Sequence, residues 1–160
     1  MSILRFLFAC FVRKRAKKCG SGLHVNRFSV VSHSTVLGDN VNFNGIRISG
    51  IGTVSIGSNF HSGRDCLIIS QNHNYDAGKA IPYDDSYIPK PVVIEDNVWI
   101  GDRVIILGGA TIREGAIIQA GSVVVGEIPS LSIAGGHPAK VFKYRNRAHY
   151  EELKKNKQFA

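Results

Sequence analysis

An aliphatic residue returns at every sixth position through the segment IEDNVWIGDRVIILGGATIREGAIIQAGSVVV, residues 94–125. The residues in phase are Ile94, Ile100, Ile106, Ile112, Ile118 and Val124. A second column of small or apolar residues runs four positions later and contains Val98, Val104, Ala110, Ala116 and Ser122. Neither an α-helix nor an ordinary β-strand has a six-residue period, so the segment must belong to a repeat architecture.

A six-residue unit with one buried aliphatic side chain fits a short strand followed by a turn. Three such units bring the chain back over its starting edge, so three units make one full coil. Stacked coils pair as parallel strands about 4.8 Å apart, and the aliphatic column of each coil is buried against its neighbours. Residues 94–129 would form two coils, and residues 37–70, where the column is less regular, two more.

The segment QNHNYDAGKAIPYDDSYIPKP, residues 71–91, interrupts the repeats and has no six-residue pattern. It contains three prolines and three tyrosines. An inserted loop of this length inside a compact domain is usually functional. We therefore expect this loop to carry part of the functional site.

The net charge of +8 is concentrated at the two ends of the chain. Residues 1–19 carry six basic and no acidic side chains, and residues 140–160 carry seven basic and two acidic ones, whereas acidic residues predominate between them. No basic face interleaved with aromatic residues is present, which argues against nucleic-acid binding. We expect anionic partners to meet the ends of the chain.

The N-terminal segment MSILRFLFACFVRKRAKKCG combines an apolar run with basic residues that follow it. A secretory signal has the opposite order, and the apolar run is too short to span a bilayer. Two interpretations remain open. The segment is either a helix packed on the body of the protein or an interfacial helix, with Phe6, Leu7, Phe8 and Phe11 in the acyl boundary and residues 13–18 on anionic headgroups.

From PVVIEDNVWIGDRVIILGGATIREGAIIQAGSVVVGEIP to AGGHPAKV, residues 91–141, the chain resembles the hexapeptide-repeat acyltransferases. The similarity is to the branch of galactoside, maltose and xenobiotic acetyltransferases and polysaccharide O-acetyltransferases. It implies an all-β fold, a left-handed parallel β-helix. It also implies a homotrimer that binds acetyl-CoA between neighbouring subunits, without a metal.

Acyl transfer from a thioester needs a base that titrates near neutral pH, which points to histidine. Of the six histidines only His73 lies in the inserted loop, in the sequence QNHNYD. The catalytic histidine of the family stands in a similar "NH" context shortly before NVWIG, so His73 is the predicted general base. Cys66 occupies an inward-facing repeat position and is rejected as a nucleophile, so transfer to the acceptor is expected to be direct.

Asp102, Ala120 and Pro138 follow one another at intervals of three repeat units, which predicts that they stack along one edge of the coils. The resemblance places Asp102, Ala120 and Trp99 in the CoA tunnel, with Pro138 further along the same edge. It assigns Lys140 and Lys143 to the CoA phosphates, for which lysine supplies charge-assisted hydrogen bonds. The chain departs from the family at Val125 and Gly126, where a Thr-Lys pair is common, so one usual phosphate contact is missing.

The acceptor is expected to be a carbohydrate, because aromatic rings and carboxylates gather in the inserted loop. The predicted acceptor-binding residues are Asn72, Tyr75, Asp76, Tyr83 and Asp84. The resulting hypothesis is a bacterial, cytoplasmic O-acetyltransferase of surface polysaccharide assembly, with contact to the inner membrane surface through residues 1–19 if that segment is interfacial.

Three alternatives are kept. An N-acetyltransferase of an amino sugar or sugar nucleotide would use the same donor and base. A zinc hydro-lyase on the same fold would need three histidines in the helix body, where only His61 and His73 occur. A non-catalytic β-helix scaffold would not need His73, Trp99 and GGHPAKV together.

The chain is predicted to form one domain, residues 1–160. Within it we expect a helical basic segment at 1–22, a β-helix at 30–134 with the inserted loop at 71–91, and a CoA-binding segment with a helical tail at 135–160.

Overall fold

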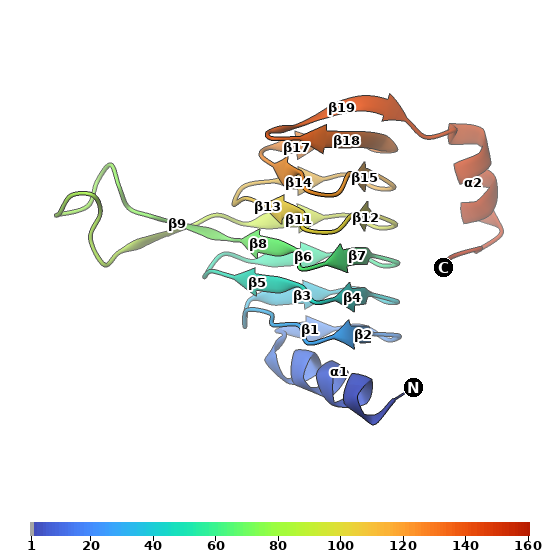
Figure 1. Cartoon of the computed structure of the whole chain (residues 1–160), viewed down its shortest axis with the longest axis horizontal. Helices are drawn as coiled ribbons and strands as arrows, with labels where there is room; N and C mark the ends of the chain where they lie inside the picture. The colour runs from blue at the N-terminus through green and yellow to red at the C-terminus, as the bar shows by residue number, and fades with distance from the viewer. Residues whose placement is uncertain (1) are drawn as a thin grey trace.

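A computed structural model describes residues 2–160 of the chain. The body is a parallel β-helix whose coils stack into a three-sided prism, with a helix at each end of the chain (Figure 1). This architecture confirms the fold class predicted from the six-residue period. Met1 of the predicted N-terminal segment lies outside the described residues.

The strands follow one another coil by coil. The first coil contains β1 (Lys18–Cys19) and β2 (His24–Arg27), the second β3 (Thr35–Leu37), β4 (Asn42–Asn44) and β5 (Arg47–Ser49), and the third β6 (Val54–Ile56), β7 (His61–Arg64) and β8 (Leu67–Ile69). The fourth contains β11 (Val92–Ile94), β12 (Trp99–Ile100) and β13 (Ile105–Ile106), the fifth β14 (Thr111–Ile112), β15 (Ile117–Ile118) and β16 (Val123–Val124), and the last β17 (Glu127–Ile128) and β18 (Ser132–Gly136). The β-helix therefore begins before the predicted boundary at residue 30.

Each side of the prism is one sheet. Face A has the order β1-β3-β6-β11-β14-β17, face B the order β2-β4-β7-β12-β15-β18, and face C the order β5-β8-β13-β16. Pairing between coils is parallel throughout. The antiparallel strand β19 (Ala139–Tyr144) then pairs with β18 and extends face B past the last coil.

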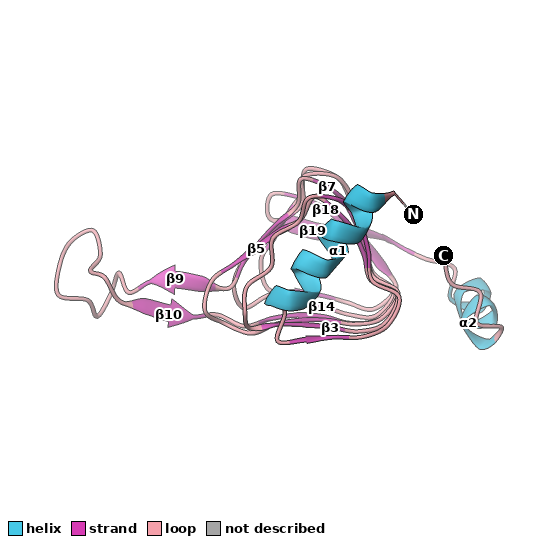
Figure 2. Cartoon of the chain, turned by 90° about the horizontal axis from the view of Figure 1, so that it is seen from below, coloured by secondary structure: helices cyan, strands magenta, loops and turns pink. Residues whose placement is uncertain are grey.

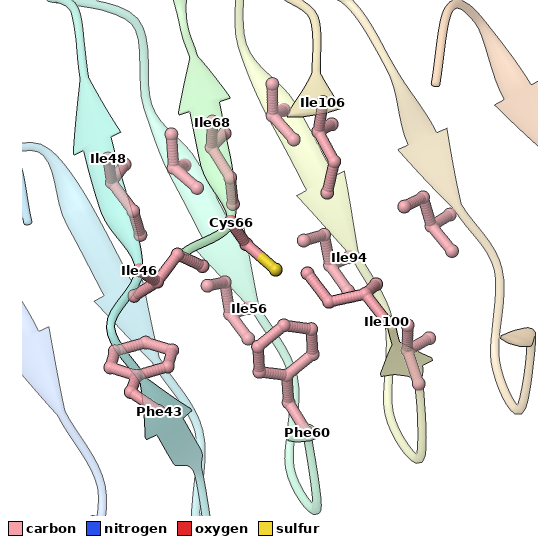
Figure 3. Packing of buried hydrophobic residues seen from close by; sticks show 14 of the residues in the cluster. Phe43, Ile46, Ile48, Ile56, Phe60, Cys66, Ile68, Ile94, Ile100 and Ile106 are labelled. Carbon is pink, nitrogen blue, oxygen red and sulfur yellow. The ribbon is translucent and has the colours of Figure 1, made fainter. Parts of the chain in front are cut away.

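Both sequence columns point into the prism, as predicted. Ile94, Ile100, Ile106, Ile112, Ile118 and Val124 are fully buried, and so are Val98, Val104, Ala110, Ala116 and Ser122. Upstream coils fill the same interior with larger rings, Phe43 and Phe60, whose centroids lie 6.1 Å apart (Figure 3). Because burying one isoleucine contributes about 1.5–3 kcal/mol, this interior column is the main source of stability.

One corner of the prism is built from asparagines in the left-handed backbone region. Asn40, Asn59 and Asn97 have φ values of 51°, 55° and 60°. Their side chains form a ladder along the stack, in which Asn40 Nδ2 donates to Asn59 Oδ1 at 3.0 Å and Asn59 Nδ2 donates to Asn97 Oδ1 at 2.9 Å. Asparagine tolerates this conformation better than most residues, so it suits a turn that recurs in each coil.

Helices cover two parts of the prism. Helix α1 (Ile3–Arg15) lies across the first coil and closes that end of the prism (Figure 2). Its own side chains Ala9 and Val12 are buried against the coil. Helix α2 (Arg147–Lys155) stands beside the prism after β19. No helix among residues 2–160 is long and apolar enough to cross a bilayer.

The inserted segment leaves the prism between the third and fourth coils. Its ends form an antiparallel hairpin of β9 (Gln71–His73) and β10 (Tyr87–Pro89), which projects away from the body (Figures 1 and 2). The backbone N of Lys90 donates to the carbonyl oxygen of Ser70 at 2.8 Å and closes its base. The predicted loop is therefore an arm with a paired stem, and its tip alone is irregular.

Candidate functional site

His73 lies at the end of the hairpin stem, where β9 runs into the tip. It pairs with Tyr87 across the ladder. The imidazole stacks on Tyr83, with ring centroids 3.7 Å apart and an interplanar angle of 22°, and it lies 4.5 Å from the ring of Tyr87. Two tyrosines from the insert therefore hold the ring of the predicted base.

One nitrogen of this imidazole has no partner within the chain. Nδ1 of His73 is enclosed and makes no hydrogen bond to any of residues 2–160. An enclosed polar atom without a partner costs about 1–3 kcal/mol, and such atoms are rare in native structures. The described chain therefore supplies no partner for Nδ1 of His73.

Not all of the predicted acceptor-binding residues are free to contact an acceptor. Asp84 is committed to the hairpin tip, because its carboxylate accepts from Lys79 N at 2.8 Å, from Ser86 N at 2.9 Å and from the Ser86 hydroxyl. The hydrogen bond from the Ser86 hydroxyl and those from the two amides lower the pKa of Asp84. Asn72, Tyr75 and Asp76 are exposed and free to meet a ligand, whereas Tyr83 packs on His73.

Trp99 lies on face B and is 54% exposed. It forms one wall of a cavity of about 440 Å³ between this face and the C-terminal segment. The other lining residues include His61, Ile117, Tyr150, Leu153 and Phe159. The cavity is mostly apolar, which suits the body of a ligand rather than its phosphates.

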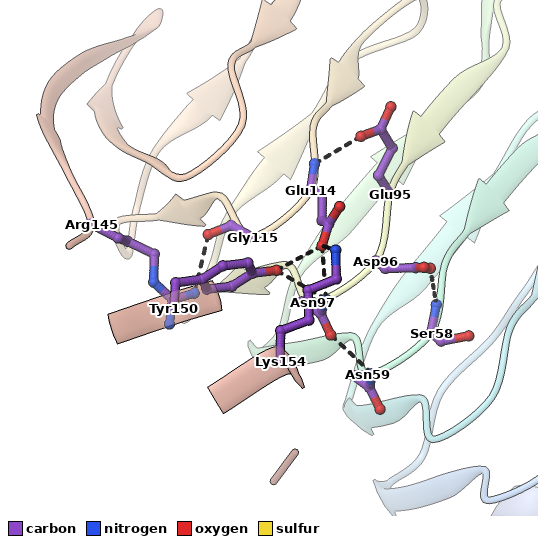
Figure 4. A network of polar contacts seen from close by, with 10 residues as sticks. All are labelled: Ser58, Asn59, Glu95, Asp96, Asn97, Glu114, Gly115, Arg145, Tyr150 and Lys154. Carbon is purple, nitrogen blue, oxygen red and sulfur yellow. Dashed lines mark hydrogen bonds and ion pairs between the residues drawn. The ribbon is translucent and has the colours of Figure 1, made fainter. Parts of the chain in front are cut away.

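A polar network attaches α2 to the prism beside this cavity (Figure 4). Glu114 Oε1 accepts from the hydroxyl of Tyr150 at 2.9 Å and pairs with the ammonium of Lys154. Asn97 Nδ2, at the end of the asparagine ladder, donates to the same hydroxyl at 2.9 Å. Burial and the bond to Glu114 raise the pKa of Tyr150 to about 12, so it stays a neutral link.

Two residues of this region, Lys154 and His61, were not among the predicted site residues. Lys154, which the sequence analysis does not single out, pairs with Glu114. His61 lies beside Trp99 in the β7–β12 register, although the inserted segment separates the two in the sequence. His61 and Trp99 are 38 positions apart, which is one coil of 18 residues plus the inserted hairpin. The spacing could therefore have revealed this pair if the hairpin had been treated as an insertion into the β-helix.

The predicted CoA edge is continuous for two coils. The carbonyl oxygen of Asp102 accepts from Gly121 N at 2.8 Å, and both Asp102 and Ala120 are exposed. The coils come very close here, because a Cβ on Gly101 would lie 2.6 Å from Ala120 N. The absence of a side chain at Gly101 therefore lets the two coils approach closely at this edge.

The predicted place of Pro138 on that edge is wrong. Ile118 pairs with Ala134, so the last coil is two positions shorter than three repeat units and Pro138 is out of register with Ala120. Beyond this pairing, Gly136 N donates to Ser122 Oγ at 3.1 Å. The shortening falls between β16 and β17, at Val125 and Gly126. Pro138 lies instead in the tight turn that joins β18 to β19.

The two predicted phosphate ligands lie on the strand that follows this turn. Lys140 pairs with Gly135 and Lys143 with Ile133 in the β18–β19 ladder, and both side chains are exposed. Neither forms an ion pair within residues 2–160. They remain free to bind an anion at the end of the CoA edge.

Cys66 is enclosed in the prism and points into the core (Figure 3). Burial raises the pKa of its thiol to about 11. A thiol in this state is a poor nucleophile because the thiolate is the reactive form. In the described part of the chain, no three His, Cys, Asp or Glu side chains gather as a metal site would require.

One chain does not bring the two halves of the predicted site together. The hairpin with His73 and the helix α2, which flanks Trp99, project from opposite sides of the prism in both views (Figures 1 and 2). Within one chain β9, which ends at His73, therefore lies on the side of the prism away from α2 and the cavity of Trp99.

The family assignment comes from sequence comparison. Residues 91–126 match the model described as bacterial transferase hexapeptide (six repeats). The chain is 33% identical to the putative lipopolysaccharide biosynthesis O-acetyl transferase WbbJ of Escherichia coli, over 87% of this chain and 78% of that protein. The chain therefore belongs to the hexapeptide-repeat acyltransferase family.

Other relatives match over a shorter part of the chain. A putative acetyltransferase of Schizosaccharomyces pombe is 56% identical over 50 residues, which is 31% of this chain and 24% of that protein. A 2,3,4,5-tetrahydropyridine-2,6-dicarboxylate N-acetyltransferase of Staphylococcus aureus is 45% identical over 53 residues, 33% of this chain and 22% of that protein. The chain thus spans about a quarter of the length of these relatives.

Solved structures agree with the fold. The hexapeptide-repeat acetyltransferase VCA0836 of Vibrio cholerae, in complex with acetyl-CoA, superposes with a TM-score of 0.74 at 27% identity and covers 84% of this chain and 74% of its own. A galactoside acetyltransferase in complex with coenzyme A gives 0.75 at 27% identity, covering 87% and 70%.

Proposed function

We propose that the protein is an acetyl-CoA-dependent O-acetyltransferase that acts on a carbohydrate hydroxyl in the assembly of a bacterial surface polysaccharide. The observation that carries this proposal is the similarity to WbbJ over most of both chains. It is supported by the acetyl-CoA and CoA complexes of the two structural relatives and by the placement of His73 in an aromatic arm.

In the proposed reaction His73 is the general base. Its Nε2 takes the proton of the acceptor hydroxyl while the oxygen forms a bond to the acetyl carbon. The thioester C–S bond then breaks, and CoA leaves as a thiolate that regains the proton. Tyr83 and Tyr87 fix the plane of the imidazole, which matters because proton transfer depends on alignment within hydrogen-bond distance. Transfer is direct, since the buried Cys66 offers no thiolate.

The donor would lie along the edge of Asp102 and Ala120. Trp99 would wall the acetyl end, and Lys140 and Lys143 would meet the phosphates, which favour lysine as a partner. Every one of these groups is exposed on one chain and is separated from its own His73. The proposed active site therefore lies between two copies.

A closed ring of three copies would complete three such sites. The hairpin leaves the prism between faces C and A, whereas Trp99 lies on face B, so the contact joins different surfaces of the two copies. Contacts of this heterologous kind generate closed rings when the rotation permits. Face C also presents the half-buried Leu67 and Ile105 side by side as outward apolar residues suited to an interface.

An N-acetyltransferase of an amino sugar or sugar nucleotide is the second candidate. It is favoured by the match to the Staphylococcus aureus N-acetyltransferase, although that match covers only 53 residues, 33% of this chain. The two functions share donor and base and differ in the acceptor atom alone.

The test is release of the CoA thiol from acetyl-CoA in the presence of pooled acceptors: simple glycosides, amino sugars, sugar nucleotides and oligosaccharides. We expect acceptor-dependent release with a hydroxyl acceptor, lost in His73→Ala and kept in His149→Ala, a matched control on the exposed side of α2. CoA release with amino sugars alone would show that the protein is an N-acetyltransferase and not an O-acetyltransferase. Release that survives in His73→Ala would refute the assigned base.

A further inference from the structure

Helix α1 has an apolar outer face. On its inner side Ala9 and Val12 are buried against the first coil. On its outer side Ile3 is 81% exposed, Leu7 is 54% exposed and Phe11 is 37% exposed, and Leu4 and Phe6 are exposed as well. A surface helix ordinarily turns polar residues to water, and a helix that is apolar all round is normally covered on both sides.

The helix is firmly held, so this face is a fixed feature of the surface. The ring of Phe28, from the first coil, lies 5.7 Å from Phe8 and 5.4 Å from Phe11. Arg13 and Arg15 donate to the carbonyl oxygens of Gly20 and Val31 and attach the end of the helix to the prism. Nothing among residues 2–160 covers the outer face, which lies at the end of the prism (Figure 2).

Positive charge surrounds the apolar face. Arg5, Lys14, Lys17 and Lys18 are exposed, and none of them forms an ion pair within the described chain. The sequence contains no acidic residue before Asp39. That carboxylate accepts two hydrogen bonds from Ser21, which lower its pKa. The face therefore combines apolar side chains with unneutralised cations.

We propose that α1 docks the protein on an anionic lipid bilayer. The helix lies in the plane of the interface, with Ile3, Leu4, Leu7 and Phe11 in the acyl boundary and Lys14, Lys17 and Lys18 on the headgroups. At 1.5 Å per residue its 13 residues are about 20 Å long, too short to span a bilayer but long enough for an interfacial anchor.

Charge decides between a bilayer and a second copy of the chain. Two copies joined through this face would bring two basic clusters close together, which is unfavourable. An anionic leaflet attracts the same cations, and each lysine near its surface contributes about five-fold in binding. The arrangement therefore fits a lipid surface best. The inference does not depend on the proposed reaction.

Co-sedimentation of the full-length protein with vesicles tests the proposal. The vesicles contain either phosphatidylcholine alone or an equal mixture of phosphatidylcholine and phosphatidylglycerol. We expect strong binding to the mixed vesicles alone, reduced by added salt because salt screens exposed charges. The variant Lys14→Gln/Lys17→Gln should lower the partition coefficient about 25-fold. Ile3→Ser/Leu7→Ser should lower it about 50-fold, since these side chains still have half or more of their surface to bury.

Matched controls carry the same chemical changes elsewhere on the surface. Ile81, 97% exposed at the hairpin tip, is replaced by serine, and Lys155 and Lys157 of the C-terminal segment are replaced by glutamine. Both controls should bind vesicles like the unmodified protein, and the α1 variants should still release CoA with a soluble acceptor. Equal pelleting with both vesicle types, or equal loss in the controls, would overturn the proposal. A lower molecular mass of the α1 variants without any lipid binding would assign the face to a second copy instead.

Discussion

Replacement of Tyr83 by alanine should lower the turnover rate without weakening acceptor binding. Tyr83 comes from the hairpin tip and stacks on the imidazole of His73 at a centroid distance of 3.7 Å. Tyr87 is the neighbour of His73 across the stem and touches the same ring at 4.5 Å and a tilt of 39°. Tyr83 thus makes the more parallel contact, and its loss frees one side of the ring.

The size of the effect follows from the strength of the contact. An aromatic pair is worth about 0.5–1.5 kcal/mol beyond its buried area. If the stack is what holds His73 aligned for proton transfer, its loss lowers kcat by about 2- to 12-fold. Tyr83→Phe keeps the stack and should stay within about two-fold of the unmodified enzyme, because the hydroxyl makes no hydrogen bond within the described chain.

The assay is initial-rate CoA release with the best acceptor from the pooled screen, with kcat and KM measured separately. Ile81→Ala is the matched control, since Ile81 belongs to the same hairpin tip, is 97% exposed and is not among the predicted site residues. A double-mutant cycle with His73→Ala should show no further loss from Tyr83→Ala, because the two residues act through one group. A rise in KM at constant kcat, or an additive effect, would refute this reasoning and restore Tyr83 to the acceptor site.

Three further outcomes are expected. Asn97→Ala should destabilise the fold by about 2–4 kcal/mol in urea unfolding, because it loses the side-chain hydrogen bonds and places alanine in a left-handed backbone conformation. Asn97→Gly should destabilise it by about 1 kcal/mol less, because glycine tolerates that conformation. Equal losses in the two variants would show that the backbone conformation is unimportant. Cys66 should resist thiol reagents at pH 8, where a pKa of about 11 leaves about 0.1% thiolate, while the exposed Cys10 reacts; rapid labelling of Cys66 would contradict its burial. Burial raises the pKa of Glu114, but the bonds from Lys154 and Tyr150 outweigh it and leave the pKa below its usual value. Because the folded pKa is the lower one, Glu114 stabilises the protein above about pH 4 and loses that contribution as pH falls through the folded value. Unfolding free energies between about pH 6 and 3 should therefore fall less steeply for Glu114→Gln, and parallel curves would exclude this role.

The regular coils were predictable because one interior position decides them. From Ile94 to Val124 each coil keeps the six-residue spacing, and every residue in the column is buried. Upstream, Val36 pairs with Ser55, a step one position longer than three repeat units, and the interior position of one strand is Ser62. This shift between the second and third coils puts the upstream column out of step with the downstream one and makes the repeat less regular there.

The stem of the insert could not be predicted from its residues. The ladder between β9 and β10 is made by backbone groups, and QNH and YIP show no alternation of apolar and polar side chains. The stacking of Tyr83 on His73 depends on how the tip folds back, which separation along the chain does not reveal. What the sequence did indicate was a histidine and several tyrosines confined to one functional insert.

The last coil is two positions shorter than three repeat units, and this shortening changes the shape of the predicted CoA edge. Had it kept the full length of three repeat units, Pro138 would lie over Ala120 and its ring would narrow the edge. The shortened coil keeps Pro138 out of that register, and the chain turns at Gly136, whose φ of 102° favours glycine. The chain can then turn back at once, so Lys140 pairs with Gly135, next to the end of the edge. An open edge that ends beside free lysines suits an extended donor with phosphates at one end, and the same short deletion produces both features.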